Sequence, residues 1–176
     1  MSTFNELGLS PQMLATVEVQ GYSTPTPIQE AAIPAILSGK DLFATAPTGT
    51  GKTAAFAIPI LQKMMENPSK NINTLVLAPT RELAHQISDN FKKYAAKTPL
   101  RITLIYGGVP QFRQVDNLKR GTQIVIATPG RLLDLMEQGY VNLKHVEHFV
   151  LDECDRMLDM GFISDIREIG TKLESL

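Results

Sequence analysis

Short apolar runs alternate with longer stretches of helical periodicity along most of the chain. The apolar runs are rich in Val, Ile and Leu and lie at 41–44, 73–77, 101–106, 123–127 and 148–152. Each run is apolar on both faces, as is typical of strands buried in a parallel sheet. On this pattern Asp152 is expected at the tip of a central strand.

Apolar residues recur at helical spacing between these runs. Helices are predicted at 54–65, 80–96, 109–119 and 129–138. Ser10-Pro11 and Thr26-Pro27 indicate two further helix starts, because proline favours the first helical position. The alternation predicts an α/β fold, a parallel sheet with helices on both faces. In such sheets ligands bind at the carboxyl ends of the strands.

Composition narrows the class of protein. The chain has 176 residues, 43% of them hydrophobic, which is enough for one domain with a sizeable core. Its formal charge is −1. Any polyanion would therefore be bound by local donors rather than by a global basic field. The longest apolar run, 54–61, contains Pro59 and is too short to span a bilayer. We expect a cytoplasmic protein without a membrane partner.

Cysteine and histidine usage points to no metal or disulfide chemistry. Cys154 is the single cysteine, so it cannot form an internal disulfide. The three histidines, His85, His145 and His148, lack the spacing of metal ligands.

A glycine-containing segment, APTGTGKT, follows the first apolar run and precedes a helical stretch. Backbone N–H groups in such a turn can wrap a phosphate chain at a helix N-terminus. Lysine can reach the β- and γ-phosphates, and the threonine hydroxyl can ligate Mg²⁺. Ala46 departs from the usual first glycine, and an ordinary strand-to-helix turn is the alternative. The predicted nucleotide-binding residues here are Ala46, Pro47, Thr48, Gly49, Thr50, Gly51, Lys52 and Thr53.

An acidic segment, Asp152-Glu153-Cys154-Asp155, ends the last apolar run. A carboxylate at the tip of a buried strand is costly without a cation. Asp152 could therefore hold Mg²⁺ through water while Glu153 orients or deprotonates an attacking water. The alternative is a solvated loop in which Arg156 forms a weak surface ion pair. Together with the glycine-containing segment, the carboxylates indicate a nucleoside triphosphate with magnesium.

An aromatic ring and a carboxamide precede these segments. Tyr22 lies seven positions ahead of Gln29. An amide can bond an adenine edge through one donor and one acceptor. Thr26-x-x-Gln29 is equally a capping box, in which Gln29 bonds back to the helix start and Tyr22 is a core ring. The residues alone leave both interpretations open.

Six segments, in this order, resemble the Q motif and motifs I, Ia, GG, Ib and II of the DEAD-box ATP-dependent RNA helicases. They are 22–29, 46–53, 79–84, 107–108, 128–131 and 150–155. The resemblance extends from Phe4 to about Phe162. It implies the first, RecA-like domain of such a helicase, which is a P-loop NTPase fold. An N-terminal helical segment with the Q motif would occupy residues 1–30 and the RecA-like ATP-binding domain residues 31–176.

The resemblance also implies roles around ATP and Mg²⁺. Tyr22 would stack on adenine and Gln29 would read its edge. Phe4 and Asp155 would belong to the same nucleotide site. Thr53 and Asp152 would bind the metal, Asp152 through water. The catalytic groups would be Lys52, Asp152 and Glu153.

RNA contacts are implied in the same way, to the sugar-phosphate backbone of a single strand and without base reading. Each segment is expected at a strand's carboxyl end before a helix, where N–H groups and a hydroxyl can bind phosphate. Taken separately, the segments PTREL and TPGR are also good helix caps. The residues concerned are Pro79, Thr80, Arg81, Gly107, Gly108, Thr128, Pro129 and Arg131.

Two departures from the family pattern bear on activity. Cys154 replaces the alanine of Asp-Glu-Ala-Asp, which should leave ATP hydrolysis intact. The chain ends at Leu176, before the motif III strand and the second RecA-like domain that supplies arginine fingers. The resemblance then implies a gap in the sheet, reduced stability and very slow hydrolysis by this chain alone.

The function expected from these observations is coupling of ATP hydrolysis to remodelling of RNA duplexes or RNA–protein complexes. A nucleotide-gated RNA clamp without catalysis is one alternative, for which Glu153 would be dispensable. Another P-loop motor, such as a DNA helicase or a small-molecule kinase, is the second.

Overall fold

The computed structural model describes residues 3–40 and 51–173. The predicted strand at 41–44 and the residues Ala46 to Thr50 of the glycine-containing segment lie outside these ranges. The chain divides into two compact units. The first contains the chain up to Pro68 together with Lys93–Thr98, and the second contains Ser69–Lys92 and the chain from Pro99 onward.

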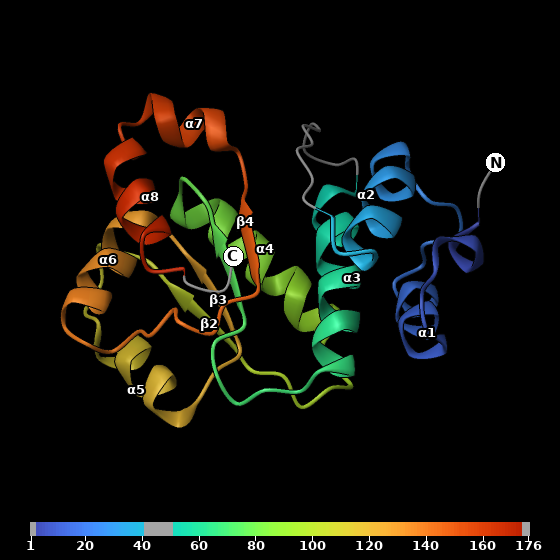
Figure 1. The fold of residues 1–176 in the computed structure, drawn as a ribbon, viewed down its shortest axis with the longest axis horizontal. Coiled ribbons are helices and arrows are strands. Elements are labelled where there is room, and N and C mark those ends of the chain that lie inside the picture. Colours follow the sequence, from blue (N-terminus) through green and yellow to red (C-terminus); the bar gives the residue numbers. More distant parts are fainter. Residues whose placement is uncertain (1–2, 41–50, 174–176) are drawn as a thin grey trace. The chain divides into compact units, whose positions relative to one another are not determined.

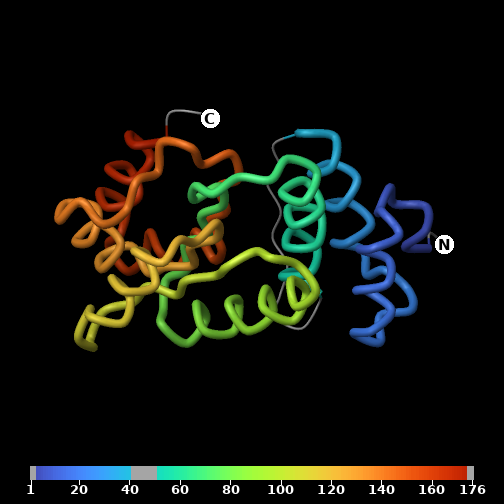
Figure 2. Tube along the Cα trace, turned by 90° about the horizontal axis from the view of Figure 1, so that it is seen from below, coloured from blue at the N-terminus to red at the C-terminus, as the bar shows by residue number. Residues whose placement is uncertain are grey.

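The described part of the first unit is helical. Its elements are the 3₁₀ helix η1 (Phe4–Leu7) and the α-helices α1 (Pro11–Val19), α2 (Pro27–Leu37) and α3 (Lys52–Glu66). Helices α2 and α3 pack side by side, as Figure 2 shows. Both helix starts predicted from Ser-Pro and Thr-Pro are confirmed, with Ser10 and Thr26 as N-caps.

The second unit is built on a parallel sheet (Figure 1). The strands have the order β2-β3-β1-β4, and all of their pairings are parallel. This confirms the α/β fold. The strands are β1 (Thr74–Leu77), β2 (Ile102–Ile105), β3 (Ile124–Ala127) and β4 (His148–Leu151).

Helices lie on both faces of the sheet. The chain moves in one direction along the sheet from β1 to β2, and in the opposite direction from β2 to β3 and from β3 to β4. Right-handed crossovers therefore put the first connecting helix on one face and the next two on the other. The connecting helices are α4 (Arg81–Tyr94), α5 (Phe112–Arg120) and α6 (Pro129–Glu137), and the short helices α7 (Cys154–Asp159) and α8 (Ile163–Gly170) follow β4.

One face of the sheet forms a continuous apolar core with α5, α6 and α8. Leu75, Leu77 and Ile105 contribute from the strands and are fully buried. Leu132 of α6 and Ile169 of α8 pack in the same cluster. Burial of such side chains stabilises the fold by roughly 1.5–3 kcal/mol each.

Strands β1 and β3 are fully buried, as predicted, but β2 and β4 are only partly buried. Over the described residues β4 pairs with β1, and the predicted strand at 41–44 lies outside them, so the central position expected for the strand before Asp152 stays a prediction. The apolar run of β4 predicted burial, whereas the position of a strand in a sheet depends on the route of the crossovers.

Helix α5 begins three residues later than the predicted start at 109. Pro110 follows Val109, and the residue before a proline is disfavoured in helical conformation. The segment 107–111 is therefore a loop. In the described ranges no helix is both long and apolar enough to cross a membrane.

Candidate functional site

The described end of the glycine-containing segment forms the start of α3. Gly51 is the N-cap, with φ 76°, and Lys52 and Thr53 occupy the first turn with half-buried side chains. First-turn N–H groups have no partner within their own helix, so this end of the helix can donate to an anion. The arrangement suits a phosphate, as the sequence predicts.

Gln29 forms the predicted capping box. Its Oε1 accepts from the Thr26 N–H at 3.0 Å, and its own N–H donates to Thr26 Oγ1 at 3.4 Å. The capping interpretation is therefore confirmed. The side chain also donates from Nε2 to the Gly51 carbonyl at 3.2 Å. Among the described residues, one N–H and one lone pair of the amide have no hydrogen-bond partner, and adenine reading stays a prediction.

Tyr22 contacts a second tyrosine of the first unit. Its hydroxyl lies 3.0 Å from that of Tyr94, and the two rings meet edge to face with centroids 6.5 Å apart. Burial raises the pKa of Tyr94, and the hydrogen bond and charge of Tyr22 raise this pKa further. Phe4 is 6% exposed, in the apolar core of the same unit. Adenine contacts by Tyr22 and Phe4 stay predictions.

The acidic segment leaves the sheet in a strained turn. Asp152 is 5% exposed, and its N–H donates to the Leu77 carbonyl at 2.9 Å. Glu153 has φ 52° and ψ 51°, the one left-handed residue other than glycine among those described. Such a conformation costs about 1–3 kcal/mol and occurs preferentially at functional sites. The turn directs the chain from β4 into α7.

The carboxylates around this turn differ in exposure. Glu153 lies 3.7 Å from Arg156 Nη1 in a partly exposed ion pair, and Asp155 is exposed on α7. No group of three His, Cys, Asp or Glu side chains that could hold a metal occurs among the described residues. The shared magnesium–triphosphate site of Lys52 and Asp152 stays a prediction.

The segments predicted to contact RNA lie at one edge of the sheet. The segment 79–81 follows β1, the segment 106–108 follows β2, and the segment 128–131 follows β3. These three strands are adjacent and parallel, so their carboxyl ends share one edge. The structure therefore brings the three segments together within the second unit.

Direct contacts connect two of these segments to a residue that the sequence analysis missed, Gln114. Its Nε2 donates to the Tyr106 carbonyl at 3.0 Å, and its Oε1 accepts from Arg131 Nη1 at 3.2 Å. Arg131 Nη2 also donates to the Val109 carbonyl at 2.7 Å. Gln114 is next to Val115 on the buried side of α5. The sequence signal that could have identified Gln114 is a polar residue on the apolar face of this helix.

Tyr106 also contacts the segment after β1. The guanidinium of Arg81 lies 5.3 Å from the centroid of the Tyr106 ring, and the His85 ring lies 5.0 Å from it. The exposed Arg81 is thus held by a cation–π contact beside the loop that follows β2. Its charge lies at the carboxyl edge.

The two helix-cap interpretations have different outcomes. Thr80 Oγ1 accepts from the Leu83 N–H at 3.2 Å, so this hydroxyl does cap α4. Thr128 is the N-cap residue of α6, but its side chain makes no capping hydrogen bond within the described part of the chain. Pro79 and Pro129 are both buried. Thr128 thus offers the hydroxyl better placed for an external ligand.

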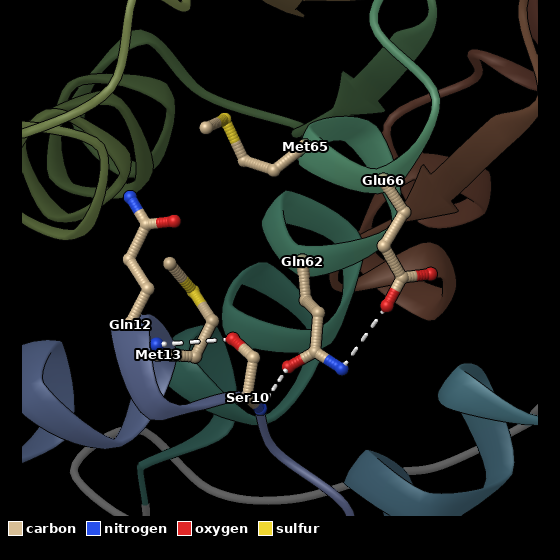
Figure 3. Close-up of a pocket in the computed structure, with 6 residues that line it drawn as sticks. All are labelled: Ser10, Gln12, Met13, Gln62, Met65 and Glu66. Carbon is tan, nitrogen blue, oxygen red and sulfur yellow. Dashed lines mark hydrogen bonds between the residues drawn. The ribbon is translucent and has the colours of Figure 1, made fainter.

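A cavity of about 190 Å³ lies in the first unit between α1 and α3 (Figure 3). Gln62 spans it, accepting from the Ser10 N–H at 2.8 Å and donating to the Gly8 carbonyl at 3.3 Å. These bonds attach the entry of α1 to α3. Its lining includes none of the predicted site residues: it consists of Ser10, Gln12, Met13, Gln62, Met65 and Glu66.

The fold and these elements define the class of protein. A parallel α/β sheet, a glycine-capped helix start and an acidic strand end are the features of a P-loop nucleotide-binding domain of the RecA type. The model of the DEAD/DEAH box helicase family matches residues 26–175, and the chain belongs to this family.

Curated relatives agree with the family assignment. The chain is 47% identical over 169 residues to the ATP-dependent RNA helicase CshA of Listeria monocytogenes, covering 96% of this chain and 32% of the relative. It is 47% identical over 173 residues to the DEAD-box ATP-dependent RNA helicase RhpA of Helicobacter pylori, covering 98% and 35%. The chain thus spans about a third of the length of these relatives.

Proposed function

We propose that the protein is an ATP-dependent RNA helicase in which the predicted site residues bind ATP and the backbone of single-stranded RNA. The whole protein couples ATP hydrolysis in the cytoplasm to remodelling of RNA duplexes or RNA–protein complexes. The observation that carries this proposal is the common carboxyl edge of β2, β3 and β1, where three candidate phosphate-binding segments lie together. Membership of the helicase family supports the same conclusion.

The nucleotide would be bound by the start of α3 and the end of β4. Oxygen donors prefer a hard cation, and the Thr53 hydroxyl and the 5%-exposed Asp152 carboxylate are such donors. They would hold Mg²⁺, Asp152 through water. The ion supplies charge neutralisation for the phosphates. Lys52 would bind phosphate from the first turn of α3 and form part of the catalytic set.

Glu153 would act on the water that attacks the terminal phosphate. Its carboxylate would accept a hydrogen bond from that water and take its proton. The left-handed turn at Glu153 supports this role, because the backbone is held in a costly conformation where a fixed side chain is needed. Asp155, on the first turn of α7, would belong to the same nucleotide site and is the exposed carboxylate of the acidic segment.

RNA would be held by its sugar-phosphate backbone, independently of base sequence. Backbone N–H groups at Gly107 and Gly108, the Thr128 hydroxyl and the Arg81 guanidinium are donors suited to phosphate oxygens. The near-neutral net charge of −1 fits binding by local donors. A second RecA-like domain would complete the RNA site and supply arginine fingers. This chain alone is expected to bind nucleotide and to hydrolyse it very slowly.

The test is Glu153→Gln in the natural full-length protein, with Asp159→Asn as the control because it makes the same charge change on exposed α7. Loss of a general base should lower RNA-stimulated ATP hydrolysis by about 10²-fold or more. Binding of ATP and RNA should persist, and the control should keep its rate. Full RNA remodelling by Glu153→Gln would instead identify a nucleotide-gated clamp.

A further inference from the structure

Gln114 is a buried amide whose two ends have different partners. It is 6% exposed, on the side of α5 that faces the sheet. Its N–H donates to the carbonyl of Tyr106, and its carbonyl accepts from Arg131. A buried polar group is costly unless it is hydrogen-bonded, and this one is bonded at both ends.

These bonds enclose Gly107 and Gly108. Tyr106 directly precedes the two glycines and Val109 directly follows them. Gln114 holds the carbonyl before the pair at 3.0 Å, and Arg131 holds the carbonyl after it at 2.7 Å. The loop is therefore fixed on both sides, and Gln114 joins the two fixing groups to each other.

Fixing this loop matters because glycines are the most flexible residues. A Cβ added at Gly107 or Gly108 would meet no atom within 4 Å, and Gly108 has φ 80°. The loop thus has open space around it and little packing to restrict it. A free glycine pair would lose conformational entropy on binding a ligand, and a loop ordered in advance avoids that cost.

We propose that Gln114 is a positioning residue for RNA binding. It holds Gly107-Gly108 and the guanidinium of Arg131 in one arrangement, so that the loop's N–H groups are ordered before they meet a phosphate of the RNA backbone. This inference rests on the proposed function. Arg131 then acts partly within the protein, because two of its nitrogens donate to protein acceptors rather than to RNA.

The amide of Gln114 makes both contacts because it has a donor at one end and an acceptor at the other. The Tyr106 carbonyl needs a donor and the Arg131 guanidinium needs an acceptor. Methionine has similar length and no comparable polar group, so Gln114→Met removes both bonds with little change of volume. Gln114→Glu keeps the acceptor for Arg131 and loses the donor to Tyr106.

The chain offers a matched control in Gln123. Its Oε1 accepts from the Arg101 N–H at 2.9 Å, so it also bonds a backbone group 22 residues away. It precedes β3 and therefore lies at the amino end of the sheet, opposite the carboxyl edge. Gln123→Met removes a comparable amide contact without touching the glycine loop.

The experiment uses the natural full-length protein and a fluorescein-labelled single-stranded oligo-uridine RNA, in the presence of a non-hydrolysable ATP analogue. Gln114→Met should raise the Kd for this RNA about tenfold, since bonds to a charged group and to a loop carbonyl are lost. Affinity for the analogue should not change. Gln123→Met should leave RNA affinity within about twofold at a similar loss of Tm.

A double-mutant cycle separates positioning from general stability. If Gln114 acts through Arg131, the losses of Gln114→Met and Arg131→Lys in RNA binding should not add. Should Gln114→Met fold poorly, Gln114→Glu serves instead, with a smaller loss expected. Equal weakening by Gln123→Met, or additive losses, would overturn the inference.

The inference and the proposed function can fail separately. Normal RNA affinity in both Gln114 variants, with a clear loss in Arg81→Ala, overturns the positioning role and leaves the RNA-binding edge intact. Normal affinity in Gln114→Met, Arg131→Lys and Arg81→Ala together overturns the proposed edge itself.

Discussion

Gln29 Nε2 donates a hydrogen bond to the carbonyl oxygen of Gly51, 22 residues further along the chain, at 3.2 Å. The bond joins the first turn of α2 to the N-cap of α3. Gln29 is only 2% exposed, so the amide is part of the packing between these helices. The position of the glycine-capped helix start therefore depends on the residue predicted to read adenine.

The Gly51 position should not accept a side chain. Gly51→Ala would put a Cβ against Gln29 Nε2 and would also place a non-glycine residue at φ 76°. Gly39→Ala is the matched control, since Gly39 has φ 81° but open space around it. We expect a loss of about 1 kcal/mol for Gly39→Ala and clearly more for Gly51→Ala. Urea unfolding followed by circular dichroism measures both, and equal losses would contradict the close approach.

Removal of the Gln29 amide should alter both stability and base selectivity. Gln29→Ala removes half of the capping box and the bond to Gly51, whereas Thr26→Ala removes only the side-chain cap. Each should lower the free energy of unfolding by about 1 kcal/mol. Only Gln29→Ala should lose preference for ATP over GTP and UTP in competition binding. Retained preference in Gln29→Ala would show that Gln29 only caps and ties the helices.

The tyrosine pair predicts an alkaline loss of stability. Burial, with the hydrogen bond and charge of Tyr22, raises the Tyr94 pKa above its ordinary value of 10.0. The folded state then holds the proton more tightly than the unfolded state. Stability should be complete below about pH 10 and fall as the pH rises from there toward the raised pKa. In Tyr94→Phe the fall in Tm between about pH 9 and pH 11 should be smaller than in the parent; an unchanged fall would exclude Tyr94 as its cause.

Ser88 predicts a stabilising substitution. This residue of α4 is 1% exposed, and its Oγ has no hydrogen-bond partner among the described residues. Ser88→Ala removes an unsatisfied buried hydroxyl and improves helix propensity. We expect a gain of about 0.5–1 kcal/mol in the free energy of unfolding. Thr80→Ala is the control, because the Thr80 hydroxyl caps α4 and its loss should lower the free energy of unfolding. Thermal unfolding of the two variants should therefore show stability changes of opposite sign.

Hydrophobic periodicity and helix-cap residues were sufficient to predict many of the strands and helix starts of this protein. The apolar runs at 73–77 and 123–127 contain the fully buried strands β1 and β3, and Ser10 and Thr26 cap the helices predicted after them. These features are local, because a strand or a cap depends on residues a few positions apart. The six motifs and their order along the chain were sufficient to predict the family, because a motif is a set of residue types that is read without knowing the fold.

Other features depended on contacts between distant residues. The order β2-β3-β1-β4 and the partial burial of β4 among the described residues could not be predicted from residue type alone. Thr80 and Thr128 both precede a helix, yet only Thr80 caps with its side chain. Gln114 became visible as a link between Tyr106 and Arg131 only in three dimensions.

The sequence by itself therefore determined the class of fold and the membership of the helicase family, and it predicts the chemistry of the glycine-containing and acidic segments. The tertiary structure decided strand order, which cap bonds form and which buried amides join separate segments. The physical reason is that propensity and motif chemistry act over a few neighbouring residues. Hydrogen bonds such as those of Gln29 to Gly51 and of Gln114 to Arg131 depend on where folding places residues far apart in the chain.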